Sequence, residues 1–247
     1  MNVQKKWFHL FFSSGKVSNN FIIFTQGRTG GTLLEDLLNC HSDLYCDGEL
    51  LNSKKYGDIK LQPLTYIKTK SQDYLNKSYG FRLKIYQLLR LSGQGTGKRL
   101  FDQLCDSGWK VIYLKRNNIF RHSLSTIRSQ ETGLWHNTLD SNLEIKRINI
   151  DKEWLIGDMK WKIQMKEKES EFLKGKNYIS LFYEDDLLKG DVHQSTADLV
   201  FDFLDLKREK VSSELIRTSY DDLTKVILNY DEVVSAIYEN QFEHFLD

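Results

Sequence analysis

The sequence is poor in proline and in cysteine. It contains one proline among 247 residues, against an average usage of about 5%, and this excludes proline-rich linkers. The three cysteines are Cys40, Cys46 and Cys105, and their spacing is not that of metal ligands. Their odd number is typical of proteins in a reducing compartment, so we expect the protein to be cytoplasmic. We expect free, buried thiols at Cys40 and Cys46, with a disulfide between them as the alternative.

Long apolar runs and an excess of one charge are also absent. No run approaches the ~20 apolar residues of a membrane span, so no transmembrane segment is expected. Lys and Arg number 35 and Asp and Glu number 34, which gives a net charge of +1. Because no basic face dominates, the sequence indicates no nucleic-acid partner. Any attraction for an anionic ligand must therefore be local.

The N-terminal residues imitate a signal peptide without meeting its requirements. A short apolar run, residues 7–12, follows Lys5 and Lys6. The run is too short for a signal peptide, and residues 13–16 interrupt it without an Ala-x-Ala cleavage site. We expect residues 1–247 to form a single domain. Within it, we expect residues 1–19 to be a peripheral segment that packs on the rest of the domain, with contact at a membrane surface as the alternative.

Apolar runs alternate with amphipathic segments along the chain. The runs predict strands over residues 21–25, 79–85, 110–115 and 177–183. Helical periodicity predicts helices over 32–40, 60–77, 98–106, 118–131, 152–174, 195–206 and 222–246. Strands that alternate with helices predict an α/β fold, a single domain with a central parallel sheet and helices on both faces. Ligands of such sheets bind beyond the carboxyl ends of the strands.

The most informative stretch joins the first predicted strand to the first predicted helix. Apolar residues 21–24 lead into a turn rich in Gly, Thr and Arg, which then enters a helical pattern. Backbone N–H groups at a helix N-terminus lack intrahelical partners and attract anions. Glycines allow an anion to approach closely, while hydroxyl groups and a guanidinium can donate to it. The turn is therefore a candidate nucleotide-phosphate site, made by Gly27, Arg28, Thr29, Gly30, Gly31 and Thr32.

This loop differs from two common nucleotide-binding motifs. A P-loop NTPase has Gly-Lys-Ser/Thr where this chain has Gly30-Gly31-Thr32, and the cation has moved forward to Arg28. The dinucleotide fingerprint G-x-G-x-x-G is not met either. A second cation, Arg116, follows the predicted strand over 110–115. Both cations lie at the carboxyl ends of strands, where a shared nucleotide site would require them.

Four blocks, in order, resemble the sulfotransferases that use 3′-phosphoadenosine 5′-phosphosulfate (PAPS). Residues 28–34, Arg-Thr-Gly-Gly-Thr-Leu-Leu, resemble their 5′-phosphosulfate loop. Residues 111–132 resemble their 3′-phosphate element, a strand that ends in Arg and a helix that bears a Ser. Residues 177–185 resemble the late strand ending in Tyr-Glu-Asp, and residues 227–232 resemble the last helical segment. The resemblance spans nearly the whole chain and is strongest to the bacterial nodulation-factor and trehalose branch.

The resemblance implies a P-loop-like sulfotransferase fold with PAPS as the sulfuryl donor. Transfer of the sulfuryl group depends on positioning and on stabilisation of charge at the leaving phosphate. Arg28 is the candidate for this stabilisation, helped by the amides of the loop, which Leu33 completes. The scheme requires no metal, and no cluster of His, Cys and Asp in the sequence indicates one.

The 3′-phosphate is assigned to Arg116 and a serine of the following helix. The surrounding Leu-Ser-Thr-Ile matches the family better at Ser125, and Ser123 is the alternative. The two serines point about 200° apart on a helix, so only one of them can face the nucleotide.

The reaction also needs a base that removes the proton of the acceptor hydroxyl. The resemblance implies this role for Glu49, which follows the first helix, and partial desolvation is expected to raise its pKa. Asp47 and Glu35 are competing carboxylates, although Glu35 has the position of a solvated helix face. His41 is a further candidate, because the cytosolic sulfotransferases use His.

The acceptor is indicated by fewer residues. Trp135 and His136 resemble the sugar-proximal segment of the trehalose enzyme, with a buried core tryptophan as the alternative. Arg82 and Lys84 share one face of a predicted strand and either reach the acceptor or line the sheet edge. We therefore expect a sulfotransferase that moves a sulfuryl group from PAPS to a hydroxyl of a small-molecule or glycan acceptor, a carbohydrate or glycolipid. A nucleotide kinase and a non-catalytic nucleotide-binding module are the alternatives, and the sequence does not indicate the oligomeric state.

Overall fold

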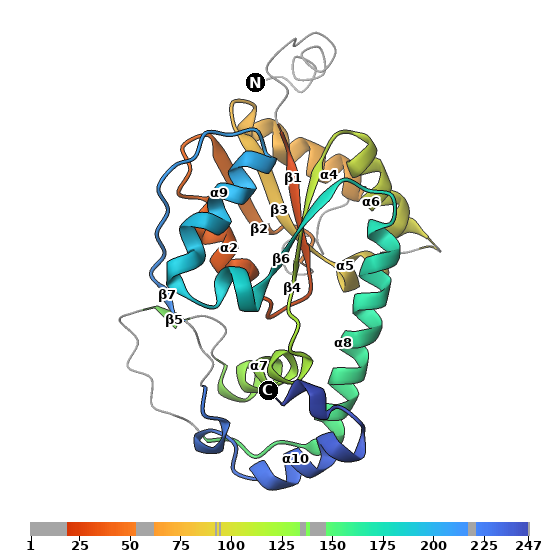
Figure 1. The fold of residues 1–247 in the computed structure, drawn as a ribbon. Coiled ribbons are helices and arrows are strands. Elements are labelled where there is room, and N and C mark those ends of the chain that lie inside the picture. The colour runs from red at the N-terminus through yellow and green to blue at the C-terminus, as the bar shows by residue number, and fades with distance from the viewer. Residues whose placement is uncertain are drawn as a thin grey trace.

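The computed structural model describes residues 19–52, 62–91, 93, 95–133, 137–138, 147–216 and 221–246. At its centre is a five-stranded sheet in the order β2-β3-β1-β4-β6, in which every neighbouring pair is parallel. The strands are β1 (Phe21–Thr25), β2 (Leu44–Glu49), β3 (Ser78–Lys84), β4 (Lys110–Lys115) and β6 (Tyr178–Phe182). Helices lie on both sides of this sheet (Figure 1), so the predicted α/β architecture is confirmed.

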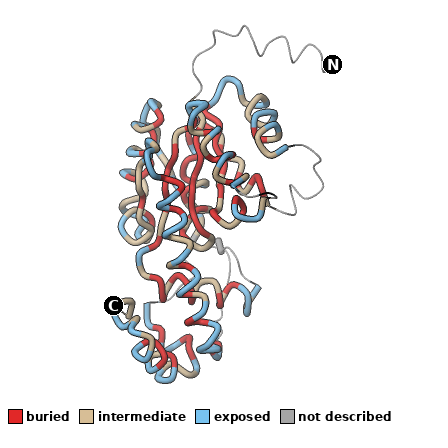
Figure 2. Tube along the Cα trace, turned by 90° about the vertical axis from the view of Figure 1, so that its right-hand side faces the viewer, coloured by how far each residue is buried: buried red, intermediate tan, exposed pale blue. Residues whose placement is uncertain are grey.

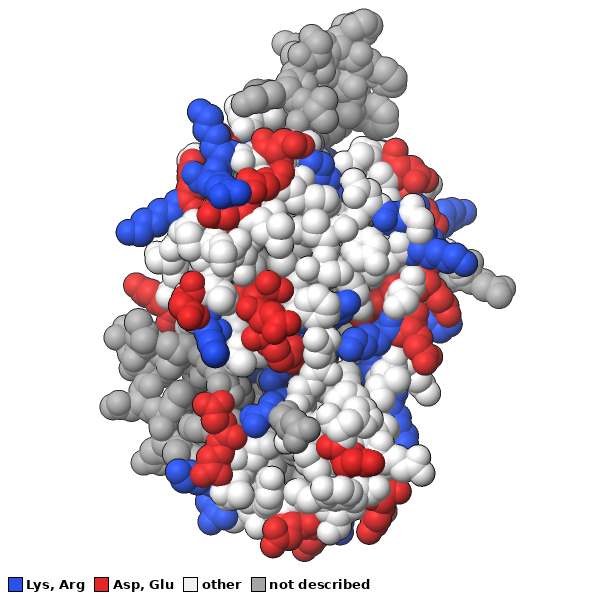
Figure 3. Space-filling view, viewed as in Figure 1, with Lys and Arg blue, Asp and Glu red and all other residues white. Residues whose placement is uncertain are grey.

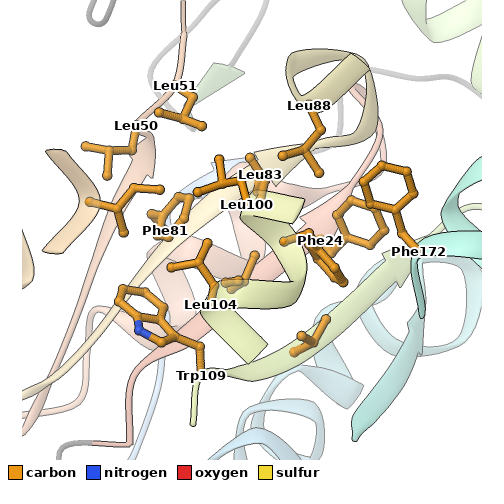
Figure 4. Close-up of a cluster of buried hydrophobic side chains, with 14 of the residues drawn as sticks. Phe24, Leu50, Leu51, Phe81, Leu83, Leu88, Leu100, Leu104, Trp109 and Phe172 are labelled. Carbon is orange, nitrogen blue, oxygen red and sulfur yellow. The ribbon is translucent and has the colours of Figure 1, made fainter. Parts of the chain in front are cut away.

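The central strand β1 shows how the sheet is covered. All its residues are buried, and successive side chains of a strand point to opposite faces. Phe21 and Ile23 pack on one face with α2 (Gly31–Leu38) and α9 (His193–Phe203). Ile22 and Phe24 pack on the other face with four helices: α4 (Pro63–Ser71), α5 (Ile85–Leu89), α6 (Thr96–Asp106) and the C-terminal end of α8 (Lys152–Leu173). Figure 4 shows Phe24 in this core beside Phe172 of α8.

A third core lies below the carboxyl ends of the strands in the view of Figure 1. It is formed by α7 (Ile119–Thr132), the N-terminal half of α8 and α10 (Tyr230–Glu239). Buried residues run through the sheet and continue into this helical part (Figure 2). Helix α8 belongs to both parts, because Leu155 and Met159 lie in the third core while Phe172 and Leu173 lie in a sheet core. One helix therefore ties the helical part to the sheet.

Short elements complete the described chain. The residue pairs 137–138 and 215–216 form a small antiparallel sheet of β5 (Asn137–Thr138) and β7 (Leu215–Ile216). Four short 3₁₀-helices are described: η1 (Gln72–Tyr74), η3 (Gly190–Val192), η4 (Leu223–Lys225) and η5 (Glu243–Phe245). The short element η2 (Tyr183–Leu187) is a π-helix.

The prediction of a continuous helix over 222–246 is wrong. The segment contains η4, α10 and η5, because residues 226–229 leave the helical path and pair with residues 148–150. Ile148 and Ile227 form a β-bridge, and the Asn229 amide both donates to the carbonyl and accepts from the N–H of Ile150. These long-range hydrogen bonds override the local helical preference.

Neither β2 nor α5 was expected from the sequence. In β2 the residues Asp47 and Gly48 have low strand propensity, Gly48 adopts φ 55°, and the register shifts between Cys46 and Glu49. The strand therefore lacks a regular apolar pattern, although its burial alternates along its length. Helix α5 follows β3 directly and is too short to show a helical period.

All three cysteines are free, which confirms the expectation of free thiols. Cys46 is buried as expected, but Cys40 is exposed, so its expected burial is wrong.

Of the helices that the structure describes, none has the length and apolar character that a membrane crossing requires. The expected peripheral segment 1–19 lies outside the described residues, apart from Asn19.

Candidate active site

A cavity of about 980 Å³ opens at the carboxyl ends of β1, β3 and β4 and is also lined by α7 and α8. In Figure 3, blue side chains are visible in the recess between the sheet part and the helical part below it. Among the described residues, the charged side chains that line it are six cations and two carboxylates: Arg28, Arg82, Lys84, Arg90, Arg116 and Lys162, with Glu49 and Asp158. The site is thus locally positive in a chain of almost neutral total charge, which favours an anionic ligand.

The loop between β1 and α2 adopts an unusual backbone conformation. Arg28 has φ 66°, a value that non-glycine residues rarely adopt, and Gly30 has φ 89°. A Cβ at Gly30 would lie 2.8 Å from the ring of Tyr183, so no side chain fits there. The first intrahelical hydrogen bond runs from the N–H of Leu34 to the carbonyl of Gly30. The N–H groups before Leu34 lie at the start of α2, where an anion is favoured.

Two buried threonines fix the base of this loop. The Thr25 hydroxyl donates to the carbonyl of Leu114 at 2.7 Å, and its Oγ1 lies 2.5 Å from Oγ1 of Thr29. Thr29 also donates to the carbonyl of Gln26. Its side chain is buried and does not line the cavity, in contrast to the other predicted loop residues, which do: Gly27, Arg28, Gly30, Gly31, Thr32 and Leu33.

A histidine of α7 holds the loop from the opposite side. His122 is buried, and its Nε2 lies 2.6 Å from the carbonyl oxygen of Gly27, so Nε2 is the donor. Burial lowers the pKa of His122 well below its usual value, and the cations Lys162 and Arg116 lower it further. The imidazole is therefore neutral and donates a hydrogen bond to the loop. This role of His122 was not expected from the sequence.

The two predicted phosphate-binding arginines lie together. Arg28 donates from Nε to Ser125 Oγ at 3.1 Å, and Arg116 donates from Nη1 to the carbonyl of Arg28 at 3.4 Å. The Arg116 guanidinium lies 4.5 Å from the ring centroid of Tyr183, within the range of a cation–π interaction. Burial lowers the pKa of Arg28, which nevertheless remains a cation at neutral pH. The strand ends of β1 and β4 thus bring both cations to one cavity.

The two candidate serines of α7 occupy different environments. Ser125 lines the cavity beside Arg28. Ser123 is completely buried and does not line it, and within the described part of the chain its hydroxyl has no hydrogen-bond partner. The structure therefore brings Arg28, Arg116 and Ser125 together and leaves Ser123 outside the group.

Glu49, the predicted base, ends the edge strand β2 and faces the cavity. Its carboxylate lies 2.5 Å from Nζ of Lys84 and 3.9 Å from Nη1 of Arg82, and it accepts from Asn52 at 3.5 Å. Burial alone would raise the pKa of Glu49, but the hydrogen bond and charge of Lys84 and the charge of Arg82 together lower it. The expected rise of this pKa is therefore wrong, and the carboxylate is ionised at neutral pH.

Arg82 connects this carboxylate to the loop. Its Nε lies 2.6 Å from a carboxylate oxygen of Glu35, and its Nη1 donates to Thr32 Oγ1 at 2.9 Å. Glu35 is therefore an ion-pair partner of Arg82 and not a fully solvated residue. Because β3 lies between β2 and β1, Arg82 and Lys84 line the cavity from an inner strand, not from the sheet edge.

The other candidate bases are engaged elsewhere. His41 is buried away from the cavity, where Nε2 donates to the carbonyl of Lys207 and Nδ1 accepts from the N–H of Asp43. Asp47 accepts a hydrogen bond from the hydroxyl of Tyr79 and does not line the cavity. Glu49 is thus the only predicted base that the described residues place in the cavity lining.

The described residues contain no group of three or more His, Cys, Asp or Glu side chains that could hold a metal ion. The residues present fit a bisphosphorylated nucleotide by their own chemistry. At Gly30 a Cβ would press against the Tyr183 ring, so the backbone there stays bare, and the start of α2 presents backbone N–H groups. Arg28 and Arg116 follow the ends of two strands, and the Ser125 hydroxyl of α7 lines the same cavity. Trp135 and His136, the predicted acceptor residues, lie outside the described part of the chain.

Known proteins resemble the chain in sequence and in fold. No model of a protein family matches the chain. It is 32% identical to nodulation protein H of Rhizobium tropici over an alignment of 127 residues, and the match covers 47% of this chain and 48% of that protein. The chain is similar in structure to a sulfotransferase from Alicyclobacillus acidocaldarius, with a TM-score of 0.51 and 10% identity over 93% of this chain and 97% of that one. The sulfotransferase domain of the Synechococcus PCC 7002 olefin synthase gives a TM-score of 0.44 and 14% identity over 79% of this chain and 76% of that one.

The Alicyclobacillus structure defines the class of the fold, which is that of the sulfotransferases. In sequence the chain is similar to nodulation protein H, and it spans about half the length of that relative. The resemblance of the sequence to the sulfotransferase family is confirmed in this way. The blocks that suggested it contain Arg28, Arg116 and Ser125, which share one cavity in the structure.

A buried carboxyl group supports the loop from behind. Glu169 of α8 accepts hydrogen bonds from the hydroxyl of Tyr113 at 2.9 Å and from the amide of Gln26 at 3.3 Å. Burial raises the pKa of Glu169 to about 7, although the hydrogen bonds from Gln26 and Tyr113 oppose the rise. The folded protein therefore binds a proton at Glu169 up to near-neutral pH, whereas the unfolded chain releases it in the ordinary carboxylate range.

This difference predicts a pH-dependent stability. A group with a raised pKa in the folded state contributes stability below its unfolded pKa and loses that contribution as the pH rises through the folded pKa. Glu169→Gln keeps a neutral acceptor and removes the titration. Between about pH 5 and 8, the wild type should lose roughly 2–3 kcal/mol relative to Glu169→Gln, at ~1.4 kcal/mol for each pKa unit. Urea unfolding at several pH values measures this, and parallel stability curves for the two proteins would contradict it.

Proposed function

We propose that this chain is a sulfotransferase that transfers a sulfuryl group from PAPS to a hydroxyl of a carbohydrate or glycolipid. The observation that carries the proposal is the joining of two anion sites in one cavity. The loop with Arg28 and the pair Arg116 and Ser125 are linked by hydrogen bonds, from Arg28 to Ser125 and from Arg116 to the carbonyl of Arg28. A nucleotide with phosphate groups on both sides of its ribose matches two such sites.

Each site has a chemical role in this proposal. The amides at the start of α2 and the Arg28 guanidinium bind the 5′-phosphosulfate and stabilise negative charge on the leaving phosphate. Arg116 and Ser125 bind the 3′-phosphate, for which a guanidinium and a hydroxyl are suitable donors. PAPS supplies an activated sulfuryl group, and the residues of the chain supply orientation and charge. No protein nucleophile or metal is needed in this scheme.

Glu49 is the proposed base. Its pKa is lowered by Lys84 and Arg82, so the carboxylate is ready to accept a proton at neutral pH. The same ion pairs fix its orientation, because Lys84 Nζ lies 2.5 Å from one carboxylate oxygen. Arg82 joins Glu49 to Thr32 at the start of α2, which relates the position of the base to that of the phosphosulfate site. We also propose a cytoplasmic location, in keeping with the three free cysteines.

The first test is nucleotide selectivity. Adenosine 3′,5′-bisphosphate should bind without Mg²⁺ and raise the melting temperature. AMP should bind about 10–100-fold more weakly, because it lacks the group that Arg116 and Ser125 would contact, and a charged hydrogen bond contributes ~1.5–3 kcal/mol. Calorimetry with the bisphosphate, AMP and ATP plus Mg²⁺ measures this. Equal affinities for the bisphosphate and AMP would refute the proposal, and preference for ATP plus Mg²⁺ would favour a kinase.

A second prediction separates the two serines of α7. Ser125→Ala should weaken the bisphosphate by roughly 1–3 kcal/mol, since a charged acceptor loses its donor. Ser123→Ala is the matched control on the same helix, and it should leave the affinity unchanged because Ser123 is buried away from the cavity. Both variants are compared by calorimetry. The reverse ranking would show that the 3′-phosphate lies elsewhere.

A third prediction concerns catalysis. Glu49→Gln preserves the shape of the side chain and removes its basicity, so sulfuryl transfer should fall by about 10²–10⁴, the usual contribution of a positioned general base. Bisphosphate affinity should change little, because Glu49 acts on the acceptor. Transfer from labelled PAPS to a panel of sugars and glycolipids measures the rate. A parallel loss of nucleotide binding would make Glu49 structural, and full activity would exclude it as the base.

A further inference from the structure

One wall of the cavity is aromatic, and the assigned nucleotide and base residues do not include it. Trp154 and Trp161 of α8 and Tyr86 of α5 all line the cavity. The two tryptophans are 39% and 38% exposed, which makes them large apolar side chains that the fold leaves open to solvent. Other tryptophan side chains can serve the core, as Trp109 does with 7% exposure. The open faces of Trp154 and Trp161 therefore require an explanation other than packing.

The tryptophans lie on the same face of one helix. They are separated by seven residues, which is nearly two helical turns, or about 10 Å along the axis. The pair Asp158 and Lys162 lies between and beside them on this face, with Nζ of Lys162 3.0 Å from the Asp158 carboxylate. Both members of this pair line the same cavity. The wall thus consists of two aromatic surfaces with a polar pair between them.

Tyr86 connects this wall to the proposed base. Its ring centroid lies 5.9 Å from that of Trp161, and Nζ of Lys84 lies 5.6 Å from the Tyr86 ring. Lys84 is the ion-pair partner of Glu49. A Cβ at Gly27 would lie 3.1 Å from the Tyr86 hydroxyl, so this hydroxyl lies beside the phosphate loop. A continuous series of contacts therefore leads from Glu49 to Trp161, and Trp154 lies further along the helix.

The chemistry of this wall matches a saccharide. A sugar ring has an apolar face of C–H groups that packs on an aromatic ring, and hydroxyl groups at its edge that need hydrogen-bond partners. Trp154, Trp161 and Tyr86 provide the aromatic surfaces. Asp158, Arg90 and Gln130 line the cavity and provide acceptors and donors for hydroxyl groups. Small-molecule sites typically combine an apolar surface with a few polar groups in this way.

We infer that the acceptor is an oligosaccharide that lies along α8, with one ring beside Tyr86 and Glu49, the next on Trp161 and a further ring on Trp154. This inference rests on the proposed function, because it assigns the acceptor side of the same cavity. It specifies three things that the proposed function leaves open. These are the wall that binds the acceptor, the order of its subsites and a preference for acceptors of more than one ring.

The experiment measures KM and kcat with acceptors of one to four sugar rings, from a panel of glucose and N-acetylglucosamine oligomers with α and β linkages. The transfer assay uses labelled PAPS. In the wild type, KM should fall with each added ring up to three. Trp161→Ala should raise KM for acceptors of two or more rings by about tenfold, the effect of one lost aromatic contact. Trp154→Ala should raise KM only for longer acceptors, and Trp161→Phe should restore most of the loss.

The matched control is Tyr238→Ala, which removes an exposed aromatic side chain of α10 that does not line the cavity. It should leave KM unchanged for every acceptor. The affinity for adenosine 3′,5′-bisphosphate, measured by calorimetry on each variant, should also stay constant. A loss of this affinity in Trp161→Ala would indicate that the tryptophan contacts the nucleotide and would overturn the inference.

Failure of the inference and failure of the proposed function give different results. If the wild type binds the bisphosphate and sulfates a sugar, but KM does not depend on ring number or on the tryptophans, the inference is overturned and the proposed function stands. If single-sugar alkyl glycosides are better acceptors than the oligomers, the wall holds an alkyl chain and the inference is again overturned. If the bisphosphate does not bind in the wild type, the proposed function itself fails.

Discussion

The arrangement of the site depends on the fixed conformation of the loop between β1 and α2. This loop contains Arg28 at a positive φ and ends at Gly30, against which the ring of Tyr183 packs, so its conformation is not one that an isolated chain would keep. It is held by hydrogen bonds from three directions, through Thr25 to β4, through His122 to α7 and through Gln26 to Glu169 of α8. Because these partners are buried, water does not compete with them.

The charged residues of the cavity are ordered by pairing. Glu35 pairs with Arg82, Glu49 with Lys84, and Asp158 with Lys162. A partly buried charge that has a partner keeps a defined position, whereas one without a partner is costly and tends to change its protonation state. The three pairs therefore preorganise the walls of the cavity. Electrostatic stabilisation requires this, because donors that are already in place do not have to reorganise during the reaction.

Sequence patterns could predict the fold and the glycine-rich loop between β1 and α2, since both depend on local features. The apolar run of β1 and the glycine-rich turn lie next to each other in the chain, and Arg116 directly follows β4. The environment of Glu49 could not be predicted in this way. Its strand is irregular around Gly48, and the lysine that lowers its pKa comes from a different strand, so desolvation was expected to dominate and did not.

Other contacts were hidden because their partners are distant in sequence. His122 and Gly27 are 95 residues apart, and a lone histidine in a helix carries no sign of such a contact. The seven-residue spacing of Trp154 and Trp161 indicates a shared helix face, but a shared face can equally be turned toward a core. The choice between Ser123 and Ser125 depended on the helix register, and the side-chain burial of the two serines distinguishes them where the sequence could not.

Helix α8 has a consequence for how such a protein can change. The two ends of α8 pack in different cores, and these contacts hold in place the part of the helix that lines the cavity. Trp154 and Trp161 line the cavity and belong to neither core, so their replacement need not disturb folding or the loop between β1 and α2. Under the proposed function, relatives that share this architecture could therefore diverge in acceptor preference through a few substitutions on one helix face. The residues proposed to bind the donor would be inherited unchanged.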